Sequence, residues 1–206
     1  MRKNALILTA LAITPAAALA APSPTSVTIA ANPTIVTYGS SITLSGAVTP
    51  AKSVKVAVTG QACVNGQGQH PLSLTSNAQG AWTATVTPGS KTTYQAKAKS
   101  ADSPMVTVQV RPRVALAKVG AHRFRTRISA GQSFGGKIAL FQKRTSVRWK
   151  TVKSIVLVQL GSGSGTIVSG KTFRSGIHRN RTVRVLITQR QVGACYLSGA
   201  SSSIRS

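Results

Sequence analysis

The sequence predicts an all-β protein made of two tandem antiparallel β-sandwiches that follow an N-terminal signal peptide. Short apolar stretches alternate with polar residues at a period of two, turn residues recur at roughly 8–12-residue spacing, and helical periodicity is hard to find. Hydrophobic residues make up 42% of the 206 residues. That fraction excludes a disordered basic chain, because such chains combine low hydrophobicity with high charge.

Residues 1–20 have the composition of a secretory signal peptide. Residues 1–4 give a basic start, residues 5–13 form an apolar run too short to span a membrane, and residues 18–20 give the small-x-small pattern of a cleavage site. We expect cleavage after Ala20. No later run is long and apolar enough for a transmembrane segment, so we expect a secreted protein that is released or held at the cell wall by charge.

Residues 21–111 are expected to form the first sandwich. Ile42 and Leu44 alternate with small or polar residues, and Val56 and Val58 repeat that pattern, which is typical of half-buried strands. The strands expected in this unit are 27–29, 35–37, 41–48, 54–59, 71–75, 81–87, 92–99 and 105–110.

Residues 112–206 are expected to form the second sandwich. Pro112 marks the boundary, because proline cannot donate to a central ladder and the charge density changes there. Each unit has about 90 residues, close to the ~100 of an immunoglobulin-type sandwich. The strands expected in this unit are 114–119, 123–129, 137–143, 149–160, 166–173, 182–188 and 194–197.

The charge balance excludes most enzyme classes. The chain has 26 Lys and Arg against one acidic side chain, Asp102, for a formal net charge of +25. Paired-carboxylate hydrolases and carboxylate-rich metal sites need several Asp or Glu. His70, His122 and His178 are too dispersed for a zinc site. We therefore expect no catalysis, no metal and no cofactor, and Asp102 is expected to form a turn.

The second unit carries most of the charge. Residues 21–111 have a net charge of +5, whereas residues 112–206 contain 18 Lys and Arg and no acid. Arg123, Arg125 and Arg127 fall on alternate positions of an expected strand, so they share one face at about 6.8 Å spacing.

A second group of cations surrounds Trp149, the aromatic residue that we expect to be exposed. It consists of Lys143, Arg144, Arg148 and Lys150. Lys143 is expected to face outward, by alternation against Leu140. Lys137 and Arg184 are expected to face outward as well, on strands that belong to a different sheet from the arginines, so charge should cover both faces. The residues expected to bind polyanions are Arg123, Arg125, Arg127, Lys143, Arg144, Arg148 and Lys150.

Cys63 and Cys195 are the only cysteines. An internal disulfide between them would close a long loop and would require the two units to fold back on one another. Two half-buried thiols and an intermolecular bridge are the alternatives that the sequence leaves open.

Three segments carry a resemblance to a known family. Residues 36–48 (VTYGSSITLSGAV) resemble the opening of bacterial Ig-like domains found in secreted, especially actinobacterial, surface proteins. Residues 148–152 (RWKTV) resemble their Trp-x-Thr-Val segment, and residues 196–202 (YLSGASS) are similar to their closing strand. The resemblance implies tandem Ig-like modules used for spacing, adhesion or attachment at the cell envelope. It transfers no catalytic or binding residues.

These observations together favour a secreted, non-catalytic Ig-like protein that binds anionic cell-wall polymers or other polyanions through its basic second unit. One alternative is a structural spacer or adhesin with no specific ligand. Another is a secreted nucleic-acid-binding or antimicrobial cation, which the low aromatic content of 4% speaks against. The sequence does not indicate an oligomeric state.

Overall fold

The computed structural model describes residues 26–64 and 68–206. The signal peptide expected over residues 1–20 lies outside the described residues. The described chain is almost entirely β-structure with one short helix, α1 (Gln189–Val192), so the all-β prediction is confirmed. Within these residues, none of the helical structure is long and apolar enough to cross a membrane.

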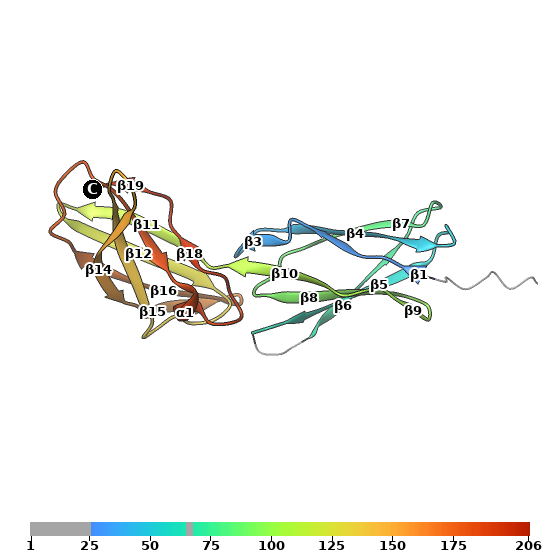
Figure 1. The fold of residues 1–206 in the computed structure, drawn as a ribbon. Coiled ribbons are helices and arrows are strands. Elements are labelled where there is room, and N and C mark those ends of the chain that lie inside the picture. The colour runs from blue at the N-terminus through green and yellow to red at the C-terminus, as the bar shows by residue number, and fades with distance from the viewer. Residues whose placement is uncertain (1–25, 65–67) are drawn as a thin grey trace, which may run out of the picture.

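Two sheets form the first unit (Figure 1). One sheet contains β1 (Ser26–Val27), β4 (Ile42–Thr49), β2 (Ala30–Asn32) and β7 (Ala81–Val86). The other contains β3 (Ile35–Thr37), β10 (Val106–Arg111), β8 (Thr92–Ala98), β5 (Lys55–Ala62) and β6 (Gly68–Thr75), with β9 (Ala101–Asp102) beside β8. The apolar residues that alternate in the sequence, such as Leu44 and Val56, face the core between the sheets and are fully buried.

Two further sheets form the second unit. The β12 sheet contains β11 (Arg113–Gly120), β12 (Arg123–Ala130), β16 (Thr166–Arg174) and β15 (Val158–Gly163). The β13 sheet contains β14 (Trp149–Val156), β13 (Ile138–Arg144), β17 (Thr182–Ile187), β18 (Gly199–Ala200) and β19 (Ile204–Arg205). Phe124, Phe141 and Phe173 form an aromatic cluster between these sheets, with ring centroids 5.0 to 5.9 Å apart.

The strand order in both units is that of an immunoglobulin-like sandwich. In the second unit the first, second, fifth and fourth strands of that plan, β11, β12, β16 and β15, share a sheet, and β13 and β17 lie opposite. In the first unit β4 and β7 lie opposite β5, β8 and β10. The predicted fold class of two Ig-like sandwiches is therefore confirmed.

The expected strand 149–160 is wrong, because the structure divides it at Leu157. β14 ends at Val156 in the β13 sheet, and β15 begins at Val158 in the β12 sheet. The Leu157 side chain is buried, and its main chain exchanges hydrogen bonds of 2.9 Å with Gly136 and Lys137. The chain therefore crosses from one sheet to the other where a core residue anchors it, a step that no turn residue signals.

The expected strand 194–197 is also absent. This segment follows α1 as an irregular stretch that contacts the first unit: the Leu197 N–H donates to the Val110 carbonyl oxygen, and the Lys91 N–H donates to that of Cys195, both at 2.9 Å. Cys195 forms a disulfide with Cys63, with the two Cα atoms 5.3 Å apart. Of the three alternatives for the cysteines, the structure therefore contains the internal bridge.

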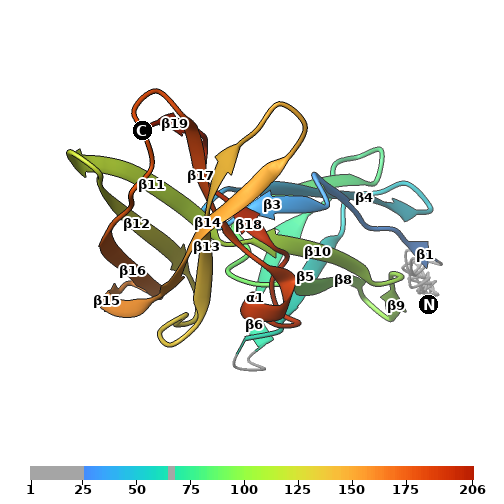
Figure 2. The same cartoon turned by 60° about the vertical axis from the view of Figure 1, so that its left-hand side comes forward.

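Tyr196 packs into the same junction, where Figure 2 shows the segment after α1 running back against the first unit. Its hydroxyl donates to the Gly89 carbonyl oxygen at 2.6 Å and accepts from the Gly131 N–H at 3.0 Å. Burial raises the pKa of Tyr196 to about 12. A covalent bond and partly buried hydrogen bonds thus join the two units, in addition to the peptide link at Pro112.

Candidate polyanion-binding surface

Arg123, Arg125 and Arg127 form a row on β12, here called the arginine row. All three side chains are exposed. They alternate along the strand with three fully buried core residues, Phe124, Thr126 and Ile128. The buried side chains fix the strand against the core, so the three arginines point to solvent on the outer face of the β12 sheet.

The residues beside Arg125 and Arg127 are small and uncharged. Arg125 stands between Ala117 on β11 and Thr172 on β16, and Arg127 lies in register with Gly170 on β16. Gly170 is required there, because a Cβ atom would come within 2.2 Å of the Thr126 carbonyl oxygen. Within the described residues, no guanidinium group of the row has a hydrogen-bond or ion-pair partner.

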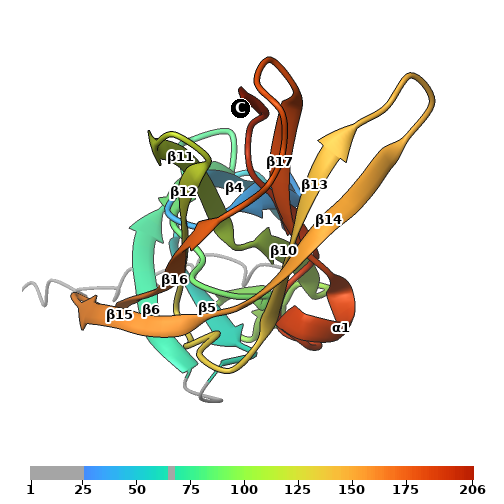
Figure 3. The same ribbon diagram turned by 90° about the vertical axis from the view of Figure 1, so that its left-hand side faces the viewer.

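The second group of cations lies on the hairpin formed by β13 and β14, which stands out from the body of the second unit in Figure 3. Its members, Lys143, Arg144, Arg148 and Lys150, are called the hairpin cluster. Arg144, Arg148 and Lys150 are exposed, whereas Lys143 is half-buried. The arginine row and the hairpin cluster lie on different sheets, as the sequence predicts.

The prediction that Lys143 faces outward is wrong. Along β13, Ala139 and Phe141 are fully buried and point to the core, whereas Leu140 points away from it. Lys143 shares the face of Phe141 and lies in register with buried Val183. The sequence prediction relied on Leu140, the larger apolar residue, as the inward-facing one. The inward position is instead taken by the small residue Ala139.

Trp149 is half-buried beneath arginines and not freely exposed. The Arg184 guanidinium carbon lies 4.2 Å from the Trp149 ring centroid, and that of Arg144 lies 5.6 Å away. Arg184 Nε also donates to Gln142 Oε1 at 2.9 Å, which holds it in place. Burial and the charge of Arg144 lower the pKa of Arg184. The ring is therefore engaged in cation–π contacts with the protein's own arginines.

Two like-charge pairs stand directly opposite each other across strands. Arg123 on β12 is in register with Arg174 on β16, and Lys143 on β13 is in register with Lys150 on β14. Cross-strand pairs of like charge are destabilising. Because residues 112–206 contain no Asp or Glu, no carboxylate side chain of this unit relieves the repulsion.

Three cations that the sequence analysis missed lie between the arginine row and the hairpin cluster, around the edge of the sandwich. Lys153, Lys171 and Arg174 line a cavity of about 350 Å³ between β14 and β16, and Lys153 Nζ donates to the Arg174 carbonyl oxygen at 2.9 Å. Lys153 reaches this edge because a β-bulge near Gln142 places it opposite Phe141. A bulge changes the side to which later residues point, so strand alternation alone could not place Lys153.

The one acidic side chain lies far along the chain from these clusters. Asp102 forms an ion pair with Lys97 at 3.4 Å, and both side chains are about half-exposed. Asp102 belongs to β9, just after the turn at Lys99, and is not itself the turn residue. In the described part of the chain, no three His, Cys, Asp or Glu side chains come together as a metal site would require.

No protein-family model matches the sequence, and no curated protein matches it. Among solved structures, the chain is similar to purple acid phosphatase PPD1 from yellow lupin (Lupinus luteus) seeds, with 9% identity over 87% of this chain and 40% of that chain, and a TM-score of 0.41. It is also similar to a marsupial T cell receptor, with 10% identity over 87% of this chain and 100% of that chain, and a TM-score of 0.29. Likeness at this level carries no statement about activity or ligand.

Proposed function

We propose that this chain is a secreted, non-catalytic protein of the cell envelope whose second unit binds anionic polymers. The observation that carries the proposal is positive charge without a counter-charge. The second unit holds 18 Lys and Arg and no acid, and it sets Arg123 opposite Arg174 and Lys143 opposite Lys150. An anionic polymer along these strands would supply the missing negative charge and relieve the repulsion.

An extended polymer suits this surface better than a single compact ligand. The arginine row repeats a charge at about 6.8 Å intervals along the outer face of the β12 sheet. Lys153 and Arg174 continue the basic surface around the edge to the hairpin cluster. A linear polyanion can contact several of these groups at once, whereas a small anion would neutralise only one or two of them.

A structural spacer is the second candidate, and the junction between the units favours it. The Cys63–Cys195 disulfide and the Tyr196 hydrogen bonds link the two sandwiches beyond the peptide chain. A spacer would keep its localisation and function when the arginines are neutralised, whereas a polymer-binding protein would lose retention on the polymer.

The test measures the affinity of the mature protein for a purified phosphodiester wall polymer over a series of salt concentrations. Counterion release makes the logarithm of the binding constant fall linearly with the logarithm of salt, by about 0.7 for each contacted charge on a flexible polyanion. The variant Arg125→Gln with Arg127→Gln should therefore reduce the slope by about 1.4. Retention that does not change between low and high salt would refute the proposal.

A matched control removes the same number of charges from the first unit. Lys55 and Lys99 are exposed there, so Lys55→Gln with Lys99→Gln lowers the net charge equally. This control should leave the slope within about 0.3 of the original, because its cations do not contact the polymer. An equal loss in both variants would show that total charge and not the arginine row governs binding. If single-stranded DNA binds the protein as tightly as the wall polymer does, the alternative of a secreted nucleic-acid-binding cation is favoured.

A further inference from the structure

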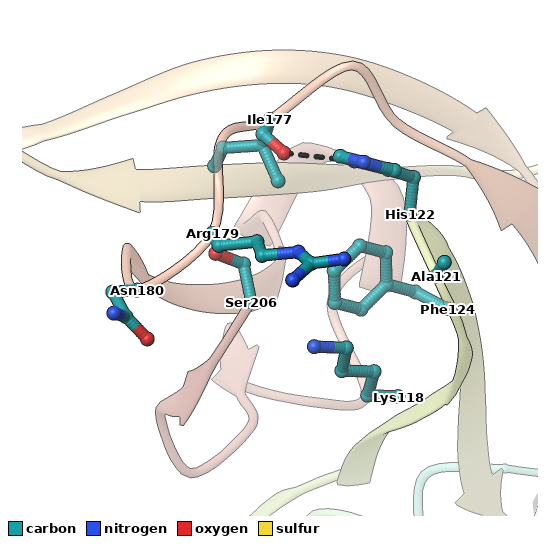
Figure 4. A pocket seen from close by; sticks show the side chains of 8 residues that line it. All are labelled: Lys118, Ala121, His122, Phe124, Ile177, Arg179, Asn180 and Ser206. Carbon is teal, nitrogen blue, oxygen red and sulfur yellow. Dashed lines mark hydrogen bonds between the residues drawn. The ribbon is translucent and has the colours of Figure 1, made fainter.

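A separate basic pocket lies at the end of the second unit, where β11 turns into β12. It has a volume of about 300 Å³, at the lower end of the range of small-ligand sites. Figure 4 shows its lining, which comes from the β11–β12 hairpin, from the loop between β16 and β17 and from Ser206. Lys118 belongs to β11, Ala121 and His122 form the turn, and Arg179 and Asn180 belong to the loop between β16 and β17.

The two permanent cations of this pocket are free to bind a ligand. Neither Lys118 nor Arg179 has a side-chain hydrogen bond or ion pair within the described residues. Ser206 also lines the pocket, and within the described residues it forms no ion pair with either cation. In Figure 4 the charged ends of Lys118 and Arg179 lie in the same part of the pocket.

The loop that carries Arg179 is held from both sides. The His122 ring lies with Nδ1 3.0 Å from the Ile177 carbonyl oxygen, and the Ser206 hydroxyl donates to the His178 carbonyl oxygen at 2.7 Å. The Arg181 N–H donates to the same Ser206 hydroxyl at 3.0 Å. A loop fixed at both ends presents its arginine with little ordering cost on binding.

His122 provides a third polar group. Because a carbonyl oxygen only accepts hydrogen bonds, Nδ1 carries the proton in the contact with Ile177, and Nε2 is the second polar atom of the ring. Phe124 and Ile177 are buried and form an apolar floor. An apolar floor excludes water on one side and strengthens charge-assisted hydrogen bonds to a bound anion.

We propose that this pocket binds a phosphate monoester group. A phosphate has three terminal oxygens that accept hydrogen bonds in different directions, whereas a carboxylate has two oxygens in one plane. Lys118 and Arg179 approach as donors from two separate chain segments, and the guanidinium fork of Arg179 matches two phosphate oxygens. The group could belong to a small sugar phosphate or to the phosphorylated end of a polymer, since both present the same chemistry.

The test is an NMR titration of the mature protein with inorganic phosphate at constant ionic strength, with acetate for comparison. Phosphate should shift the amide signals of residues 118–124 and 177–181, and acetate should shift them less. Lys118→Gln and Arg179→Gln should each weaken phosphate binding about tenfold, because each removes a charged hydrogen-bond partner. Arg179→Lys keeps the charge but loses the fork and should weaken it less. Phosphate shifts that are spread over the surface, or unchanged in the Arg179→Gln variant, would overturn the proposal.

Two further arms identify the source of the phosphate. Glycerol 3-phosphate tests the small ligand, and a short phosphodiester polymer before and after phosphatase treatment tests the polymer end. Binding of either one at the same amide signals supports the pocket and assigns its ligand, and binding of neither overturns it.

The result is separable from that of the polymer-binding test. The variant Arg125→Gln with Arg127→Gln lies outside the pocket and should bind phosphate as the original protein does. If that variant loses phosphate binding, the pocket assignment is wrong. If Arg125→Gln with Arg127→Gln leaves the salt slope of polymer binding unchanged while Arg179→Gln still weakens phosphate binding, only the polymer proposal fails.

Discussion

Tyr196→Phe tests whether the Tyr196 hydroxyl holds the two units together. The substitution removes only the oxygen atom, so the ring still fills its place against Phe134, 5.8 Å away between centroids. It leaves the Gly89 carbonyl oxygen and the Gly131 N–H without the partner that now satisfies both. Because both groups lie in a partly buried junction, the loss should lower the free energy of unfolding by about 1 to 3 kcal/mol at pH 7.

The same hydroxyl makes stability depend on alkaline pH. Burial raises the pKa of Tyr196 to about 12, whereas an unfolded tyrosine titrates near 10. Above pH 10 the unfolded chain therefore releases a proton that the folded chain keeps, so the stabilisation present below pH 10 is lost as the pH rises toward 12. At pH 11 this difference amounts to about 1 kcal/mol.

The assay is urea unfolding of both proteins at pH 8 and pH 11, with the difference between variants isolating Tyr196 from other titrating groups. Tyr94→Phe is the matched control. Its hydroxyl is buried without a hydrogen-bond partner in the described structure, and burial raises the pKa of Tyr94. Tyr94→Phe should therefore reduce the alkaline loss of stability while costing little at pH 7.

Equal behaviour of the two variants at pH 7 would refute the reasoning. If Tyr196→Phe costs no more than Tyr94→Phe, the two hydrogen bonds of the Tyr196 hydroxyl do not stabilise the junction. If Tyr196→Phe loses as much stability as the original protein between pH 8 and pH 11, the hydroxyl is not the group that titrates.

Two further predictions concern the first unit and the disulfide. Gly46→Ala should destabilise the protein by about 1 to 3 kcal/mol in urea unfolding, because its Cβ atom would lie 1.9 Å from the Thr28 carbonyl oxygen and 2.6 Å from the Trp82 ring. The control Gly161→Ala should cost under about 0.5 kcal/mol, because its Cβ atom would meet nothing within 4 Å. Equal costs of the two substitutions would contradict this packing. Replacing the Cys63–Cys195 disulfide by two serines should lower stability by about 2 to 5 kcal/mol, given its 132-residue separation, and an unchanged denaturation midpoint would contradict this expectation.

The strands of this protein are largely predictable because most of them bury one face and expose the other. The arginine row is the clearest example: Phe124, Thr126 and Ile128 alternate with arginines that cannot be buried without a partner, so only one orientation is stable. The same argument failed at Lys143, where Ala139 occupies the inward position and Leu140 the outward one.

The features that sequence reasoning missed depend on contacts between distant segments. Lys118, His122 and Arg179 meet because loop 175–181 folds over the β11–β12 turn, and no local pattern relates positions 118 and 179. The stretch 194–197 has the composition of a strand, yet its main chain pairs with the first unit instead of a sheet. Tertiary context decides both cases, and a single sequence carries little information about such contacts.

The positive charge of the second unit is distributed unevenly along the molecule. β11 leaves the junction at Arg113 and reaches the turn before His122 about 27 Å away, at 3.4 Å per residue. Lys118, Arg123 and Arg174 therefore lie toward the end of the second unit that is remote from the first, as Figure 1 shows for the course of β11. The disulfide and Tyr196 fasten the opposite end to a weakly basic unit, so the proposed polymer binding predicts that an extended polyanion contacts the far end most closely. A protein attached in this way would hold its first unit away from the polymer.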